Sequence, residues 1–282
     1  MLQIGELKEM AVQVRRDVVR MIHGAKSGHT GGSLGCADFM TVLYFNVLEH
    51  DSSKFTRDGK GQDVFFLSNG HIAPVLYSVL ARTGYFPVEE LGTLRRLGSR
   101  LQGHPSVSHH LPGIRMASGS LGQGMSNAIG MALAKKMDGD GHLVYTLHGD
   151  GELEEGQIWE SAMFAGAKHV DNLISVVDHN GLQIDGATKD VMDLGDVHAK
   201  FAAFGWEVLS MNGNDVAEVE KQLRTAKERT GKGKPVMIVM ETEMGHGVDF
   251  MKNLAKWHGT APDDAQAEEA LKQLPSTRYG DY

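Results

Sequence analysis

The sequence has little of what several large classes of protein depend on. Its 282 residues include one cysteine, Cys36, which excludes an internal disulfide and suits a reducing compartment. No uninterrupted apolar run approaches the roughly eighteen residues that a membrane span needs. The first ten residues, MLQIGELKEM, lack a basic region followed by an apolar run, so we expect no signal peptide. These absences predict a cytoplasmic protein that does not bind a membrane.

Clusters of basic residues are also missing. The chain has 28 lysines and arginines against 36 aspartates and glutamates, which gives a net charge of −8. Without a basic patch, binding to nucleic acid is not expected. Proline is scarce at 7 residues and glycine abundant at 35, and no linker, repeat or low-complexity block is present. This composition favours one folded domain with many tight turns over a disordered chain.

Short apolar runs alternate with helical patterns along the chain. The runs typical of buried strands are 64–67, 143–147, 173–177, 206–209 and 236–240. Helical spacing marks 7–25, 36–47, 72–83, 88–97, 125–136, 158–167 and 216–229, and glycines at 28–35 interrupt it. This alternation predicts an α/β fold, a parallel sheet flanked by helices on both faces.

Two segments depart from the alternation. Residues 98–122 have little periodicity, and long irregular segments inside a compact domain are often functional. Residues 262–282 are polar, with one short helix near 264–274 and an expected loose end. We therefore predict a folded domain over 1–260 and a polar C-terminal extension over 261–282.

Polar segments directly follow three of the expected strands. These segments are Ser68-Asn69-Gly70-His71, Gly149-Asp150-Gly151 and Asp178-His179-Asn180. Ligands of parallel α/β sheets bind beyond the carboxyl ends of the strands. The sequence therefore places a candidate site at this edge of the sheet.

Asp150 and Asn180 together predict a magnesium site. Asp150 offers a charged oxygen and Asn180 a neutral one, and the backbone carbonyl of Leu182 could add a third. A Mg²⁺ ion with few protein ligands usually completes its shell with phosphate oxygens, so the pair points to a bound diphosphate. The helix expected between the two residues would direct its N-terminus at the same anion. The alternative is two ordinary turns, since Asp, Asn and Gly are common turn residues.

The whole stretch from GDGELEEGQIWES to NLISVVDHNGLQIDG resembles the thiamine diphosphate motif, which opens with GDG and closes with an Asn after a strand. More narrowly, five segments resemble transketolase: SGHTGGSLG at 27–35, FLSNGH at 66–71, GHP at 103–105, GSLGQG at 119–124 and WHG at 257–259. The resemblance runs from about residue 8 to 260 and is to the N-terminal, diphosphate-binding part of transketolase alone. It implies the PP-type thiamine diphosphate-binding fold.

The resemblance also implies roles for individual residues. It makes Asp150, Asn180 and the Leu182 carbonyl ligands of Mg²⁺, for which Ca²⁺ or Mn²⁺ could substitute. It implies that thiamine diphosphate is bound by His29, His71, Gly119, Leu121, Gly149, Asp150, Gly151, Asn180, Ile184 and His258. It implies catalytic roles for His29, His104 and His258, which would line the channel to the thiazolium and contact the sugar. Histidine suits such roles because it exchanges protons near neutral pH.

The implied reaction transfers a two-carbon ketol unit from a ketose phosphate to an aldose phosphate. In the family, a second domain carries the glutamate that activates the cofactor and the arginines that hold the sugar phosphate. Neither that glutamate nor those arginines have a counterpart in this chain. The resemblance therefore implies a separate C-terminal subunit with the pyrimidine-binding domain, in an α₂β₂ assembly. Glu155 and Glu160 would lie at the interface and communicate with the partner's catalytic carboxylate. Thr30 replaces the proline of the usual SGHPG segment, which leaves the identity of the sugar open.

Other interpretations stay open at this stage. The chain could be the α-type subunit of another thiamine diphosphate enzyme, such as a 2-oxo acid dehydrogenase or a deoxyxylulose phosphate synthase. It could also be a non-catalytic subunit that holds the cofactor. GSLGQG is not GxGxxG, so a nicotinamide site is not expected. For the residues to which the resemblance gives no role, we expect structural or surface positions: His109, His110, His148, His179, His246 and Cys36.

Overall fold

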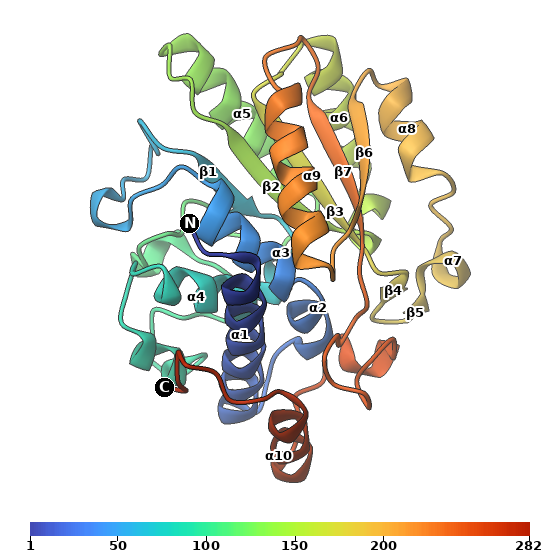
Figure 1. Cartoon of the computed structure of the whole chain (residues 1–282). Coiled ribbons are helices and arrows are strands. Elements are labelled where there is room, and N and C mark those ends of the chain that lie inside the picture. Colours follow the sequence, from blue (N-terminus) through green and yellow to red (C-terminus); the bar gives the residue numbers. More distant parts are fainter.

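A computed structural model describes residues 1–282 and contains one parallel sheet of five strands (Figure 1). The strands are β1 (Val64–Leu67), β2 (Val144–Gly149), β3 (Leu173–His179), β6 (Glu207–Asn212) and β7 (Val236–Glu241). Their order across the sheet is β1-β2-β3-β7-β6, and every neighbouring pair is parallel. The predicted α/β class and the positions of all five strands are confirmed.

Helices cover both faces of the sheet. One layer contains α1 (Ile4–Ala25), α2 (Thr30–Gly35), α3 (Ala37–Val42), α4 (Ala73–Arg82), α9 (Val216–Arg229) and α10 (Asp264–Gln273). The other contains α5 (Gln123–Met137), α6 (Gly156–Ala167) and α8 (Val197–Ala203). Alternate residues of each strand pack into opposite layers: Phe65 joins the first core and Phe66 the second. Because β1, β2, β3 and β7 are buried on both faces, they read as mostly apolar runs, whereas the edge strand β6 is only partly buried.

The remaining elements are short. After β3 the chain forms a hairpin of β4 (Leu182–Gln183) and β5 (Gly186–Ala187), followed by α7 (Thr188–Val191). Neither the hairpin nor α7 and α8 were predicted, because two-residue strands and helices of one or two turns leave no readable period. None of the helices combines the length and the apolar character required to cross a membrane.

Two predicted elements are wrong in extent. The segment at 28–35 was expected only to interrupt helical structure, yet Thr30–Gly35 forms α2. Its glycines permit close packing: a Cβ on Gly31 would lie 2.5 Å from Cγ of Met244. The helix expected over 88–97 is a 3₁₀ turn that ends at Thr93, because Arg95 adopts a left-handed backbone conformation with φ of 59°.

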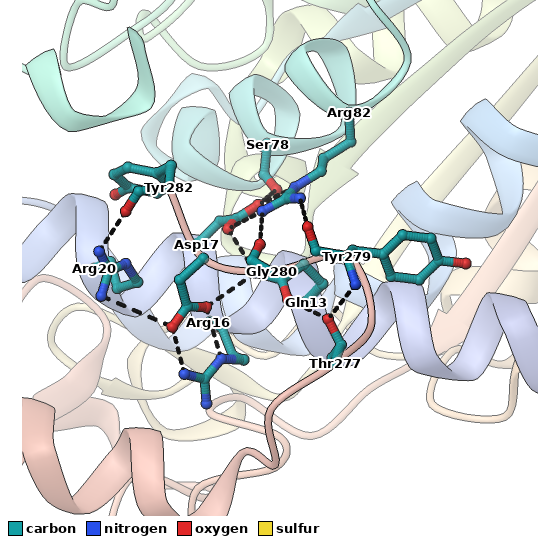
Figure 2. A network of polar contacts seen from close by, with 11 residues as sticks. Gln13, Arg16, Asp17, Arg20, Ser78, Arg82, Thr277, Tyr279, Gly280 and Tyr282 are labelled. Atoms are coloured by element: carbon teal, nitrogen blue, oxygen red, sulfur yellow. Dashed lines mark hydrogen bonds and ion pairs between the residues drawn. The ribbon is translucent and has the colours of Figure 1, made fainter. Parts of the chain in front are cut away.

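The prediction of a loose C-terminus is also wrong. The last residues run along α1 towards α4 and are held there by polar contacts (Figure 2). Arg16 donates from Nε to Oδ1 of Asp281 at 2.8 Å, and Arg82 donates to the carbonyl oxygens of Tyr279 and Gly280. Arg82 also pairs with the fully buried Asp17 at 2.8 Å. A polar composition suggested a solvated tail, whereas the tail binds charged residues of two helices.

Candidate active site

A pocket of about 260 Å³ opens at the carboxyl ends of β1, β2 and β3. This is the edge where the sequence placed the site. The pocket is lined by His29, Gly32, Asn69, His71, His104, Gly119, Leu121, Gly149, Asp150, Gly151, Glu152, Asp178, Asn180, Leu182, Gln183, Ile184, Met244 and His258.

Asp150 and Asn180 meet on one wall of this pocket. Asp150 is 2% exposed and accepts hydrogen bonds from the backbone N–H groups of Gly151 at 2.8 Å and Gly181 at 2.6 Å. Asn180 donates from Nδ2 to Oδ2 of Asp178 at 2.9 Å, while its Oδ1 accepts from Leu182 N–H at 2.9 Å. The turn after β3 is therefore hydrogen-bonded to the segment after β2, which brings the two ends of the motif together.

This wall concentrates negative charge. Burial, with the adjacent Asp178 as the second cause, raises the pKa of Asp150 to about 7. Burial also raises the pKa of Asp178, against hydrogen bonds from Thr242 and Asn180 that lower it. Two neighbouring buried carboxylates favour either protonation or a bound cation.

The chemistry of these groups fits a hard divalent cation. Carboxylate, amide and backbone oxygens are the ligands that Mg²⁺ and Ca²⁺ prefer. No group of three His, Cys, Asp or Glu side chains is arranged to hold a metal by itself. A cation bound at Asp150 would therefore need oxygens from the backbone and from a bound anion.

Four histidines that also line the pocket face one another and form a second wall of it. The ring centroid of His29 lies 5.1 Å from that of His71, 6.1 Å from that of His104 and 5.7 Å from that of His258. His71 and His258 are 5.0 Å apart. Burial lowers the pKa of all four rings, and the pKa of His29 falls to about 4, with His258, His104 and Arg95 as further causes. The cluster is therefore neutral near pH 7 and can both donate and accept protons.

Four distant segments bring the cluster together. His29 precedes α2, His71 lies in the 3₁₀ turn after β1, His104 belongs to the irregular segment, and His258 follows the turn Ala255–Trp257. Thr30 donates from Oγ1 to the carbonyl oxygen of Thr260 at 2.9 Å, which joins the segments of His29 and His258. The threonine that replaces the usual proline therefore makes a contact of its own.

The pocket gathers most of the predicted residues but leaves two outside. The predicted lining residues are His29, His71, His104, Gly119, Leu121, Gly149, Asp150, Gly151, Asn180, Leu182, Ile184 and His258. Glu155 and Glu160 do not line the pocket: Glu155 precedes α6, Glu160 lies within it, and both are exposed. Their predicted interface role stays a prediction.

The sequence missed six residues of the lining: Gly32, Asn69, Glu152, Asp178, Gln183 and Met244. Asn69 and Asp178 belong to the strand-end segments that placed the site, but neither was assigned a role there. Glu152 resembled a surface residue in an acidic run, yet it is 1% exposed. Met244 carries no signal in the sequence.

Histidines outside the motifs have other partners. His148 is fully buried on β2, and Cys36 is fully buried as expected. His179 contacts Glu241 and His246 contacts Glu243, each at 2.7 Å, while His109 and His110 are exposed. None of these residues lines the pocket.

Comparison with known proteins agrees with this site. Residues 7–278 match the family described as "Transketolase, thiamine diphosphate binding domain". The chain belongs to the transketolase family. Its members transfer ketol groups, and this chain corresponds to their N-terminal, thiamine diphosphate-binding part.

Relatives of this transketolase-family chain fall into two sizes. One subunit of the apulose-4-phosphate transketolase of Phocaeicola vulgatus is 38% identical, and the match covers 97% of this chain and 95% of that protein. The 6-deoxy-6-sulfo-D-fructose transketolase subunit SqwG of a Clostridium species is 39% identical, over 95% and 96%. The transketolase structure from Campylobacter jejuni has a TM-score of 0.88 at 34% identity, over 97% of this chain but 43% of that one. This chain therefore matches the two subunits over nearly their whole length and corresponds to less than half of the longer transketolase.

Proposed function

We propose that this chain is the cofactor-binding subunit of a two-chain transketolase that moves a two-carbon ketol unit from a ketose phosphate to an aldose phosphate. The observation that carries the proposal is a single pocket that has Asp150 and Asn180 on one wall and four neutral histidines on the other. Histidines that are neutral near pH 7 can exchange protons with a substrate, in addition to any contact that they make with the cofactor.

The first wall would hold the diphosphate end of the cofactor. Asp150, Asn180 and the Leu182 carbonyl would hold Mg²⁺, and the oxygens of the diphosphate would complete its shell. Gly151 would offer its backbone N–H to the same anion. Bound thiamine diphosphate would supply a carbon nucleophile that also stores the electron pair of the broken carbon–carbon bond.

The second wall would handle the protons of the sugar. Cleaving and forming the bond next to a carbonyl requires a hydroxyl to lose a proton and an alkoxide to regain one. His29, His104 and His258 are neutral near pH 7, so each can accept a proton at one ring nitrogen and donate at the other. His71 packs against His29 and His258 at the more buried end of the cluster.

A separate partner chain would complete the site. The relatives support this, since this chain corresponds to 43% of the Campylobacter jejuni transketolase, and the relatives that it matches over their whole length are named as subunits. We propose that the partner carries the pyrimidine-binding domain and that two copies of each chain assemble as α₂β₂. Glu155 and Glu160, exposed beside the pocket loops, would face the partner's catalytic carboxylate.

The direct test supplies the reconstituted pair with different donors. The pair is assayed with ketose phosphates, including apulose 4-phosphate, with 6-deoxy-6-sulfofructose and with 2-oxo acids, in the presence of thiamine diphosphate and Mg²⁺. We expect ketol transfer from a sugar and none from a 2-oxo acid. Turnover of a 2-oxo acid alone would favour another thiamine diphosphate enzyme, and cofactor binding without any turnover would favour the non-catalytic alternative.

A further inference from the structure

Glu152 is a buried carboxylate with an unusual set of partners. It lies in the 3₁₀ turn Gly151–Glu154 directly after β2 and is 1% exposed. Its Oε1 accepts hydrogen bonds from the Gly122 N–H at 2.8 Å and from the Ser68 hydroxyl, and its Oε2 accepts from the Gly149 N–H at 3.1 Å. A buried carboxylate is costly unless it is bonded, and here both oxygens are.

The three donors come from three different segments of the chain. Ser68 directly follows β1, Gly122 precedes the first turn of α5, and Gly149 ends β2. Ser68 also accepts at Oγ from the Gly124 N–H at 3.0 Å, inside the first turn of α5. Glu152 and Ser68 therefore connect the end of one strand, the start of a helix and the turn after a second strand.

Each connected segment carries part of the pocket. Asn69 follows Ser68, Leu121 precedes Gly122, and Asp150 follows Gly149, and all three line the pocket. The segments are packed as closely as glycine permits, since a Cβ on Gly124 would lie 2.3 Å from the Ser68 side chain. A change at Glu152 would therefore affect three segments that line the pocket.

We propose that Glu152 is a positioning residue for the cofactor, whose carboxylate fixes the spacing of the strand ends and the GSLGQG loop that bind thiamine diphosphate. The inference rests on the proposed function of the pocket. The alternative is that Glu152 is only an acceptor for buried donors and stabilises the fold without affecting cofactor binding.

Glu152→Gln separates these alternatives. Glutamine keeps the shape but has one acceptor oxygen, so its NH₂ group would have to face the N–H of Gly122 or of Gly149. We expect the affinity for thiamine diphosphate and Mg²⁺ to fall about 10-fold or more, from the loss of a charge-assisted hydrogen bond and the donor left unsatisfied. Calorimetric titration of the assembled complex at 25 °C measures it, and kcat at saturating cofactor should change much less. A purely structural role would lower the unfolding temperature and leave the affinity of the folded complex unchanged.

A second variant and a control keep the test decisive. Ser68→Ala removes one donor and should weaken binding in the same direction, and the double variant should lose less than the product of the two single effects because both act through one bond. Glu228→Gln, at an exposed position of α9, should bind as the wild type does. If both Glu152→Gln and Ser68→Ala bind the cofactor with wild-type affinity, the inference about Glu152 is overturned and the proposed function of the pocket stands. If Glu152→Gln does not fold, Ser68→Ala decides. A wild-type complex that binds no cofactor contradicts the proposed function, and the inference falls with it.

Discussion

At the scale of single residues, burial sets the chemistry of the pocket more than residue type does. The chain has fourteen histidines, and the four in the pocket are set apart by a lowered pKa and by their contacts with one another. Asp150 differs from the surface aspartates for the same reason, since burial raises its pKa while two backbone N–H groups bind it.

The pocket wall that contains Asp150 and Asn180 gives the first prediction. Asp150→Ala and Asn180→Ala should each reduce the affinity for thiamine diphosphate and Mg²⁺ by roughly 100-fold, because each removes an oxygen that would bind the cation. Calorimetry of the assembled complex measures the loss. Asp138→Ala, at an exposed position after α5, is the matched control and should bind normally. Undiminished binding in both pocket variants would contradict the proposed site.

The low pKa of His29 gives the second prediction. The ring titrates near pH 4 in the folded protein and near 6.5 in the unfolded chain, so the unfolded chain binds more protons between these values. His29 therefore destabilises the fold increasingly as pH falls from about 7 towards 4. His29→Asn lacks this effect, so its unfolding temperature should rise relative to the wild type between pH 7 and pH 5.

Thermal unfolding of the wild type and of His29→Asn is measured across that pH range, and the two unfolding temperatures are subtracted at each pH. The subtraction removes the opposing effect of Asp150, which both proteins contain. Asp150 has a raised pKa and favours the folded state at low pH in both proteins. A difference between the two proteins that does not change with pH would mean that His29 titrates normally.

At the scale of elements, short connections place the functional groups. The 3₁₀ turn at Gly70–Ile72 carries His71, and α2 begins directly after His29. A Cβ on Gly70 would lie 2.5 Å from Oγ of Ser118, so this turn packs directly on the segment that leads into GSLGQG. The helices and strands themselves supply a rigid base, and the pocket is built at their ends.

The C-terminal tail gives the third prediction. Asp281→Ala removes the partner of Arg16, whose side chain is 9% exposed, and should destabilise the fold by about 1–3 kcal/mol because a mostly buried guanidinium loses its carboxylate. Urea unfolding measures the free energy. The control is Glu268→Ala, which breaks an exposed i,i+4 pair with Lys272 and should leave the free energy of unfolding nearly unchanged, because solvent screens exposed pairs. Equal effects of the two variants would mean that the tail contributes little to stability.

At the scale of the whole molecule, the chain corresponds to less than half of the longer transketolases that it resembles. Apolar side chains are exposed at the pocket and on α6, among them Ile184 at 64% and Met163 at 55%. Exposed apolar residues near a site are typical of a surface that another chain covers.

The fourth prediction follows from the proposed two-chain assembly. The chain alone should show no measurable ketol transfer, whereas mixing it with the partner chain should restore turnover, because the activating carboxylate would come from the partner. Light scattering should report a heterotetramer under the same conditions. Robust turnover by the purified chain alone would contradict the two-chain proposal.

The sequence predicted the fold class from local patterns, and it predicted most of the pocket from the strand-end segments together with the resemblance to transketolase. Runs such as 64–67 are apolar throughout since both faces of β1 are buried, and motif residues such as Asp150 stand directly at strand ends. Tertiary structure decided what local patterns do not encode. In the sequence, Glu152 is one of several acidic residues, and only the structure shows that Ser68, Gly122 and Gly149 donate hydrogen bonds to it. The polar tail likewise suggests a solvated segment, and only the structure shows that Arg16 and Arg82 bind it. Of these partners, Ser68, Gly122, Arg16 and Arg82 are distant in sequence, and only the folded chain brings their charges and donors into contact.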